Sequence, residues 1–160
     1  MSHFLVIIQL NTIGTIHNAM REAHRDTRWE EIVSEIIVDD EWRDALDGLQ
    51  EFSHIWVVFF LDRMSAPDSP RVRPMQREDM PVVGRFATRS PQRPNPIGIC
   101  AVELLEVRGN VLRVCGLDAL DGTPLLDIKP YLSRGDAIAN ARVAEWVKKY
   151  WATDAPAQGH

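Results

Sequence analysis

Seven of the ten prolines in this 160-residue chain fall between Pro67 and Pro96, and this cluster limits the fold more than any other feature of the sequence. Proline lacks a backbone N–H and fixes φ, so a segment this rich in proline cannot form an α-helix or an interior strand. Only Val82–Thr88 has room for a brief strand. The sequence therefore predicts a long functional loop, with the regular structure of the domain on either side of it.

The segments on either side of this loop read as short strands. The run Ile55–Leu61 is too short for a helix and is rich in β-branched and aromatic residues, which predicts a strand buried on both faces at the centre of a sheet. The polar segment Asn18–Glu31 stays open between a loop and a short helix. The remaining strands are predicted at Phe4–Ile16, where Gly14 allows a bend or a close approach, at Ile32–Val38, and in a hairpin of Ile97–Val107 and Val111–Gly116, with another turn at Asp121-Gly122.

Two helices complete the predicted elements. Asp40 can cap a short helix that ends near Gly48, and Asp136 can cap a helix that runs to about Trp151. Many short strands with few helices favour a mainly β fold, a small closed or nearly closed β-barrel that is not Rossmann-like. We expect residues 1–151 to form one domain and residues 152–160 a frayed tail. The apolar stripes of the two helices are Trp42, Ala45, Leu46 and Leu49, and Ala139, Val143, Trp146 and Tyr150.

The composition, 45% apolar and 26% charged, is that of one ordinary globular domain. The longest apolar run is far short of the roughly 18 residues of a membrane span, and Met1–Leu10 lacks the features of a signal peptide, so we expect a cytoplasmic protein. Cys100 and Cys115 are the only cysteines, which predicts two buried thiols and no structural metal site. No glycine pattern indicates a Rossmann dinucleotide site or a P-loop.

The charge is distributed unevenly along the chain. The net charge is −5, yet the window from Arg71 to Arg93 holds six arginines against two acidic residues. Near the end of this window and just after it, Pro91, Pro94 and Pro96 stiffen the backbone, so the loop presents its guanidinium groups at little cost in entropy. Such a loop suits capture of carboxylate or phosphate. Charge alone leaves a solvated basic loop equally open.

Two other segments carry candidate polar groups. Leu117–Tyr131 places three aspartates within ten residues, and a carboxylate there can accept hydrogen bonds from ribose hydroxyls or from an ammonium. Its spacing does not match a calcium or magnesium loop, so we assign no metal. Ser53 and His54 are neighbours that an extended strand would point to opposite faces, so we interpret His54 as structural.

Four motifs in series closely resemble the TrmO family, also called TsaA-like or YaeB-like, of S-adenosylmethionine-dependent tRNA methyltransferases. They are IGTI from Ile13, DALDGLQEFSHIWVVF from Asp44, VGRFATRSPQRPNPIG from Val83 and GLDALDGTPLLDIKPY from Gly116. The resemblance implies a homodimeric β-barrel with the cofactor near the subunit interface. It also implies methylation of the N6 amine of N6-threonylcarbamoyladenosine, the modified base just 3′ of the anticodon.

The resemblance also implies site residues, motif by motif. No catalytic residue is assigned, because the sulfonium already activates the methyl group and the protein chiefly has to align the reactants. The implied cofactor contacts are Arg89, Ile99, Cys115, Gly116, Leu117 and Asp118, with Leu61 and Asp62 at positions where relatives often carry Phe-His. The residues expected to face the substrate are Arg85, Arg93, Asn95, Lys129 and Tyr131.

Two departures from the family pattern keep other functions open. His24–Trp29 reads HRDTRW where some relatives carry an Arg-Gln-Pro cofactor motif, and the chain ends without the extra C-terminal domain of longer bacterial members. Both bear on the RNA substrate more than on the cofactor. The alternatives are a methyltransferase for another, small substrate, and a barrel that binds S-adenosylmethionine or RNA without turnover.

Overall fold

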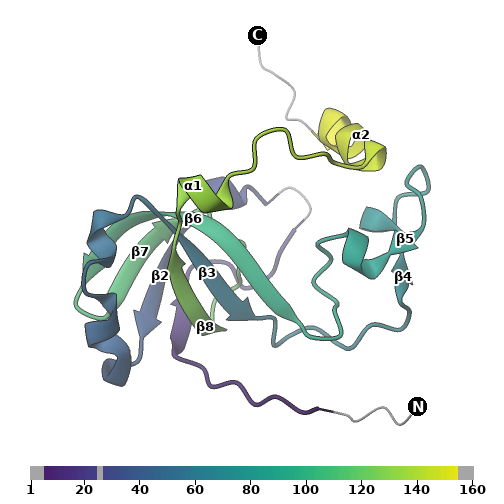
Figure 1. The fold of residues 1–160 in the computed structure, drawn as a ribbon. Coiled ribbons are helices and arrows are strands. Elements are labelled where there is room, and N and C mark those ends of the chain that lie inside the picture. The colour runs from purple at the N-terminus through teal and green to yellow at the C-terminus, as the bar shows by residue number, and fades with distance from the viewer. Residues whose placement is uncertain (1–5, 25–26, 155–160) are drawn as a thin grey trace. The chain divides into compact units, whose positions relative to one another are not determined.

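The computed structural model describes residues 6–24 and 27–154, and a six-stranded closed barrel is its main feature (Figure 1). Neighbouring strands are antiparallel and follow the order β1-β2-β7-β6-β3-β8 around the barrel. The predicted fold class, a closed β-barrel that is not Rossmann-like, is confirmed. The strands are β1 Gly14–His17, β2 Val33–Val38, β3 His54–Phe60, β6 Ile97–Arg108, β7 Val111–Cys115 and β8 Thr123–Pro130.

Alternation along the strands builds the core. In β3 the side chains of Ile55, Val57 and Phe59 are buried, whereas their neighbours point outward and are half-buried or exposed. The prediction that this strand is buried on both faces is therefore wrong, because the barrel covers only its inner face. The other strands add Ile16, Ile36, Val38, Val102, Leu112, Val114 and Leu125, and Leu46, Leu117 and Ala119 join the core from outside the strands.

The first and last barrel strands differ from the prediction. The strand predicted at Phe4–Ile16 begins only at Gly14, since residues 6–13 form no strand and the first two residues of the prediction lie outside the described ranges. Gly14 does make the expected close approach, because a Cβ there would lie 2.2 Å from the carbonyl oxygen of Ile37. β8 is not predicted from the sequence, because its prolines at positions 124 and 130 weaken the strand pattern.

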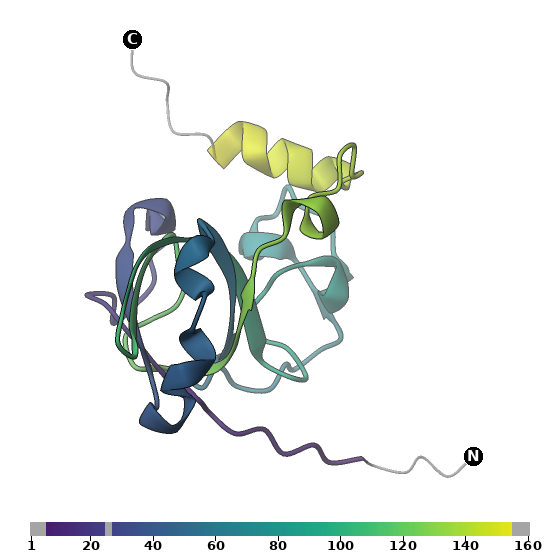
Figure 2. The ribbon, with the colours of Figure 1, turned by 60° about the vertical axis from the view of Figure 1, so that its left-hand side comes forward.

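The helix predicted from Asp40 is a pair of 3₁₀ helices, Asp40–Leu46 and Leu49–Glu51, which lies across one mouth of the barrel (Figure 2). The residue at its N-cap is Asp39, whose side chain makes no capping bond. Of the predicted apolar stripe only Leu46 is buried. Asn18–Glu31 forms turns that end in a 3₁₀ helix, Trp29–Glu31, apart from two residues outside the described ranges.

Hairpin chemistry was predicted more accurately. The turn between β6 and β7 places Gly109 at φ +60°, and Gly122 adopts φ +81° at the turn before β8. Both positions need the left-handed backbone that glycine adopts without strain.

The prediction of two buried thiols is wrong, because Cys100 and Cys115 are half-buried.

A second compact unit comprises residues 65–94 and 132–160, and the first unit holds the barrel. In this second unit β4 Arg71–Val72 pairs with β5 Val83–Gly84, inside the stretch predicted to form a brief strand. Two 3₁₀ turns, Pro74–Gln76 and Arg85–Ala87, are its other regular structure within the proline-rich loop.

The C-terminal helix also begins later than predicted. A short helix, α1 Ser133–Asp136, ends at the residue expected to start the long one, and α2 covers Glu145–Asp154. Ala139 and Val143 therefore precede α2, and only the second half of the predicted stripe is helical. In the described residues, no helix is long and apolar enough to cross a membrane.

Candidate functional site

Most of the predicted cofactor residues lie toward one end of the barrel. Antiparallel pairing brings the end of β3 beside the start of β6, where Phe60 pairs with Ile97. The backbone N–H of Leu61 then donates to the carbonyl oxygen of Pro96 at 2.8 Å. The chain leaving β7 passes the same part of β6, because the thiol of Cys100 donates to the carbonyl oxygen of Gly116 at 3.3 Å. Leu61, Ile99 and Gly116 therefore belong to one rim of the barrel.

These residues present different groups. Leu117 is fully buried in the core, so only its backbone can meet a ligand. Ile99 lies on the outer face of β6 and is 51% exposed. Gly116 adopts φ +92°, a conformation that favours glycine. The Cys115 thiol donates to the carbonyl oxygen of Glu30, whereas Asp118 and Asp62 are exposed.

A polar network that the sequence analysis missed holds the same rim together. The side-chain amide of Asn18 donates to Ser34 Oγ at 3.0 Å and to the carbonyl oxygen of Ala119 at 2.9 Å. The carboxylate of Asp121 accepts the backbone N–H of Asn18 and lies 3.3 Å from Nδ1 of His17. The backbone bond, and then the imidazole, hold the pKa of Asp121 below its usual value. Asp121 is thus more than the turn residue that its Asp-Gly sequence indicates.

Arg63 fixes this network to the segment after β3. Its guanidinium donates to the carbonyl oxygens of Asp121 and Arg21. Three loops from distant parts of the sequence are therefore tied together at the rim where the predicted cofactor residues lie. No residue spacing indicates such a contact, because it depends on which strands become neighbours.

Two of the predicted substrate residues lie at the other end of the barrel. Lys129 and Tyr131 are at the end of β8, which pairs with the start of β3. The ammonium of Lys129 lies 2.6 Å from a carboxylate oxygen of Asp127, and the ring of Tyr131 lies 5.7 Å from that of Trp56. Asn95 is exposed just before β6. The structure therefore does not bring Lys129 and Tyr131 to the rim of the cofactor residues.

The same end carries an apolar groove of about 610 Å³ between β8 and the 3₁₀ helices of residues 40–51. Trp42, Leu46, Phe52 and Ile128 are among its lining residues, and none of the predicted site residues is. Near this end, Ser53 Oγ lies 2.9 Å from Nδ1 of His54, so the expectation that these neighbours point apart is wrong. Ser53 precedes β3, and its backbone does not follow the strand alternation.

The three arginines that were predicted as site residues, Arg85, Arg89 and Arg93, lie in the second unit and have different surroundings. Arg85 is buried, and its guanidinium donates to the carbonyl oxygens of Ser69 and Gln92, both at 3.0 Å. Arg93 is half-buried and donates to the carbonyl oxygens of two residues of its own loop. Arg89 is exposed, and no hydrogen bond or ion pair joins it to any residue in the described ranges. Of the three, Arg89 is the one available to an anion.

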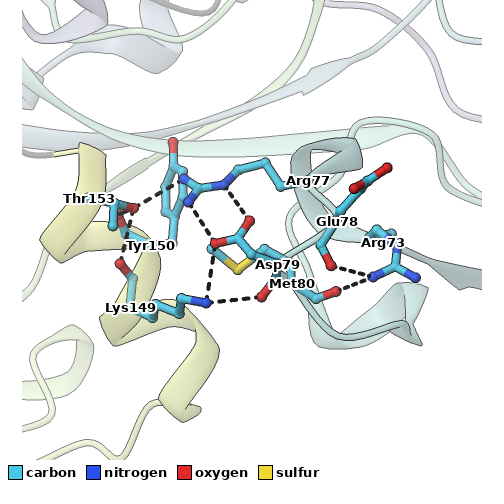
Figure 3. Close-up of polar contacts among 8 residues, drawn as sticks. All are labelled: Arg73, Arg77, Glu78, Asp79, Met80, Lys149, Tyr150 and Thr153. Atoms are coloured by element: carbon cyan, nitrogen blue, oxygen red, sulfur yellow. Dashed lines mark hydrogen bonds and ion pairs between the residues drawn. The ribbon is translucent and has the colours of Figure 1, made fainter.

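A second cluster of charges fastens α2 to the proline-rich segment (Figure 3). The carboxylate of Asp79 accepts two hydrogen bonds from Arg77, at 2.9 and 3.0 Å, and lies 3.2 Å from the ammonium of Lys149. These partners, Arg77 first, lower the pKa of Asp79 to about 2. Arg77 also donates to Thr153 Oγ1 on α2. The cluster is satisfied internally, which fits a structural role.

The residues described here offer no metal centre, since no three histidines, cysteines or acidic residues among them are placed to hold an ion. In the second unit, Arg89 is an exposed cation without a protein partner among the described residues. In the first unit, the rim presents backbone, apolar and carboxylate groups, which suit an organic ligand.

Comparisons with known proteins match this description. The family model described as tRNA-methyltransferase O N-terminal domain matches residues 12–137. A probable S-adenosyl-L-methionine-binding protein of Archaeoglobus fulgidus is 42% identical over 142 residues, 87% of this chain and 38% of that protein. The tRNA (adenine(37)-N6)-methyltransferase of Escherichia coli is 38% identical over 144 residues, 83% of this chain and 61% of that protein.

Among solved structures, the crystal structure of TrmO from Pseudomonas aeruginosa superposes with a TM-score of 0.75 at 30% identity. The match covers 99% of this chain and 67% of that one. The chain thus spans little more than a third of the first of these relatives and about two thirds of the other two.

Proposed function

The chain belongs to the tRNA-methyltransferase O family, and from this membership we propose that it is an S-adenosylmethionine-dependent methyltransferase acting on tRNA. The observation that carries the proposal is the family match, because residues 12–137 include all six barrel strands and the arginine-rich loop. The finer proposal is that the methyl group goes to N6 of N6-threonylcarbamoyladenosine, next to the anticodon. A tRNA substrate implies the cytoplasm, and two cysteines without a disulfide suit that reducing compartment.

The residues present fit the cofactor. S-Adenosylmethionine carries a carboxylate and an ammonium, and Arg89 is an exposed guanidinium without a partner in the described ranges. We assign the carboxylate to Arg89, and the ammonium or a ribose hydroxyl to Asp118. We assign the other contacts to Ile99, through its exposed apolar side chain, to Cys115, Gly116 and Leu117, chiefly through their backbone, and to Leu61 and Asp62 after β3.

Bound in this way, the cofactor supplies a methyl group that its sulfonium already activates. The protein then has to hold the accepting amine in line with that methyl group and keep water out. The rigid rim suits this task, since the bonds of Asn18 and Arg63 fix the loops that present Gly116 and Asp118. A preorganised loop loses little entropy when it binds.

We place Arg85, Arg93, Asn95, Lys129 and Tyr131 on the substrate side, with different roles. Arg85 contributes by holding the loop, because its guanidinium is committed to two carbonyl oxygens. Arg93 and Asn95 each precede one of the prolines that stiffen the loop. Lys129 and Tyr131 are the basic and aromatic groups at the far end of β8, where an extended RNA can reach beyond the reacting base.

We further propose that the chain acts as a homodimer with the cofactor near the interface. An apolar strip on the outer face of β3 and β6 supports this, because Phe60 pairs with Ile97 across the strands and both are more than a third exposed. Ile99 continues the strip. The test is sedimentation equilibrium of the wild type and Ile97→Glu. A dimer that dissociates in the variant supports the proposal, and a monomeric wild type contradicts it.

The decisive experiment is single-turnover transfer of a labelled methyl group from S-adenosylmethionine to tRNA, with and without the threonylcarbamoyl group. Transfer only to the modified tRNA supports the full proposal. Transfer to other small acceptors alone favours a methyltransferase of different specificity. Cofactor binding without any transfer favours a non-catalytic binding barrel.

Calorimetric titration with S-adenosylmethionine tests the binding site separately. We expect Arg89→Ala to weaken binding at least tenfold, about 1.4 kcal/mol, while the variant stays folded. Lack of binding by the folded wild type at millimolar cofactor would contradict the proposed function.

A further inference from the structure

Phe86 is the most exposed aromatic side chain of the second unit, with 78% of its surface accessible. It stands between two of the arginines that the sequence analysis singled out, yet no role has been assigned to it. Burying a phenylalanine ring lowers the free energy, so a ring this exposed is stabilised when a ligand covers it.

The loop beneath the ring is held in place on several sides. The backbone N–H of Arg85 donates to the carbonyl oxygen of Pro70, and its buried guanidinium joins the loop to Ser69 and Gln92. Thr88 caps the turn, because both its backbone N–H and its hydroxyl donate to the carbonyl oxygen of Arg85. The ring is therefore presented by a fixed backbone, and binding to it costs little entropy.

Arg93 contributes a cation to the same surface. Its guanidinium carbon lies 5.6 Å from the centroid of the Phe86 ring, while Nη1 donates to the carbonyl oxygens of Thr88 and Ser90. The guanidinium lies over one face of the ring. A ring paired in this way with an arginine matches the way proteins hold unpaired nucleobases, which stack on aromatic rings and on arginine planes. A base also offers oxygen and nitrogen acceptors to such a cation.

The surroundings favour a nucleobase over an apolar protein surface. The loop of residues 65–94 carries six arginines against Asp68, Glu78 and Asp79, which gives it a net charge of +3 in a chain whose net charge is −5. In the sequence, Phe86 is flanked by Arg85 and Ala87. A net positive charge attracts the phosphates of RNA.

We propose that Phe86, together with Arg93, is a stacking platform for an unpaired base of the RNA substrate, next to the adenosine that receives the methyl group. This inference rests on the proposed function. It adds a residue outside the cofactor contacts whose task is to hold the RNA so that the target amine stays in position. It predicts that Phe86 affects RNA binding and leaves cofactor binding unchanged.

The test uses a labelled anticodon stem-loop RNA and the variants Phe86→Leu and Phe86→Tyr. Leucine keeps an apolar side chain but has no aromatic face, so we expect RNA affinity to fall at least tenfold, about 1.4 kcal/mol. Tyrosine keeps the face, so affinity should stay within about twofold of the wild type. Val82→Ala is the matched control, because Val82 is an exposed apolar side chain of the same unit and should change nothing.

A second measurement does not depend on the stability of the leucine variant. RNA with 2-aminopurine beside the target adenosine should change its fluorescence on binding the wild type and respond differently to Phe86→Trp. Two results would overturn the platform. One is equal RNA affinity of the wild type and Phe86→Leu, and the other is a fluorescence change that is the same in the wild type, Phe86→Leu and Phe86→Trp. So would a change of oligomeric state in Phe86→Leu with RNA affinity unchanged, because the ring would then contact another copy of the chain.

The cofactor titration separates the two levels of the inference. If the wild type binds S-adenosylmethionine and RNA but Phe86→Leu behaves identically, the platform alone is wrong. If the folded wild type binds no RNA, the proposed tRNA substrate is wrong and the platform falls with it.

Discussion

The two units of this chain reach a defined structure by different means. The barrel has a continuous apolar core, and all thirteen residues of its buried cluster lie in that unit. In the second unit the buried residues include Met80, Pro74 and an arginine. Its loop is shaped by arginine side chains that donate to backbone carbonyl oxygens, at Arg73, Arg85 and Arg93.

This difference explains why each unit suits its proposed task. Apolar burial is non-directional and makes a stiff frame, so the barrel holds the ends of its strands in fixed relation. Guanidinium-to-carbonyl bonds fix a loop without an apolar core and leave basic groups at its surface. A binding loop thereby keeps its charge and still has a defined shape.

The largest effect should come from emptying the barrel core with Phe59→Ala. Phe59 is 2% exposed, so its removal leaves a cavity and should lower the free energy of unfolding by about 3–5 kcal/mol. The matched control is Phe60→Ala, since Phe60 is 38% exposed on the outer face of the same strand. Urea unfolding followed by circular dichroism measures both. Equal losses in the two variants would refute a core that lies on one face of β3.

The next largest effect should be local to the arginine-rich loop. Arg85→Met keeps the length of the side chain but leaves the carbonyl oxygens of Ser69 and Gln92 without this donor, at a cost of about 1–3 kcal/mol. Hydrogen exchange should accelerate in residues 84–90 and remain slow in the barrel strands. Arg89→Met is the control, and it should lose cofactor affinity with exchange unchanged. Faster exchange throughout the barrel would mean that Arg85 also stabilises the barrel, and would contradict a role limited to the arginine-rich loop.

The sequence predicted the parts of the fold that local chemistry decides. Three features follow from backbone preferences of neighbouring residues: the tight turns at Gly109 and Gly122, the alternating strands of the β6–β7 hairpin, and the absence of α-helix in the proline-rich loop. β8 escaped notice because its prolines at 124 and 130 weaken a pattern that barrel pairing tolerates. The helix predicted from Asp136 started too early, because its apolar spacing extends over residues that precede α2.

The sequence predicted the motifs of the candidate site but not the contacts that its side chains make. Arg89 stands out by charge and stiff surroundings, whereas the distinction between it and the buried Arg85 depends on which carbonyl oxygens lie within reach. The same holds for the network of Asn18, Asp121 and Arg63, which links loops far apart in the sequence. Neither is a property of spacing along the chain.

A smaller effect should distinguish the stability of the barrel from the contribution of its rim to cofactor binding. Gly116→Ala and Gly109→Ala both force a side chain onto a backbone with positive φ, with no atom within 4 Å of the new Cβ. Each should therefore cost about 1–2 kcal/mol of stability from backbone strain alone. Only Gly116→Ala should also weaken S-adenosylmethionine in a calorimetric titration, because Gly109 is in the turn away from the proposed contacts. Equal cofactor affinity in both variants would remove Gly116 from the site.

The smallest effect concerns the charged contact between α2 and the proline-rich segment. The pKa of Asp79 in the folded protein is about 2, below its ordinary value of 3.8. The ionised carboxylate therefore stabilises the fold fully at pH values above 3.8, and this stabilisation is lost as the pH falls through about 2. Since the pair is exposed, the loss should be small and should shrink further in high salt. We expect tryptophan emission from α2, which carries Trp146 and Trp151, to change between about pH 4 and about pH 2 in the wild type. Asp79→Asn should show that change already at neutral pH, and an identical acid titration in the two proteins would mean that Asp79 does not hold the helix. The buried cluster of the barrel is entirely apolar, so acid acts on the barrel only through carboxylates outside that cluster, such as Asp121 on the rim, whose pKa is also lowered.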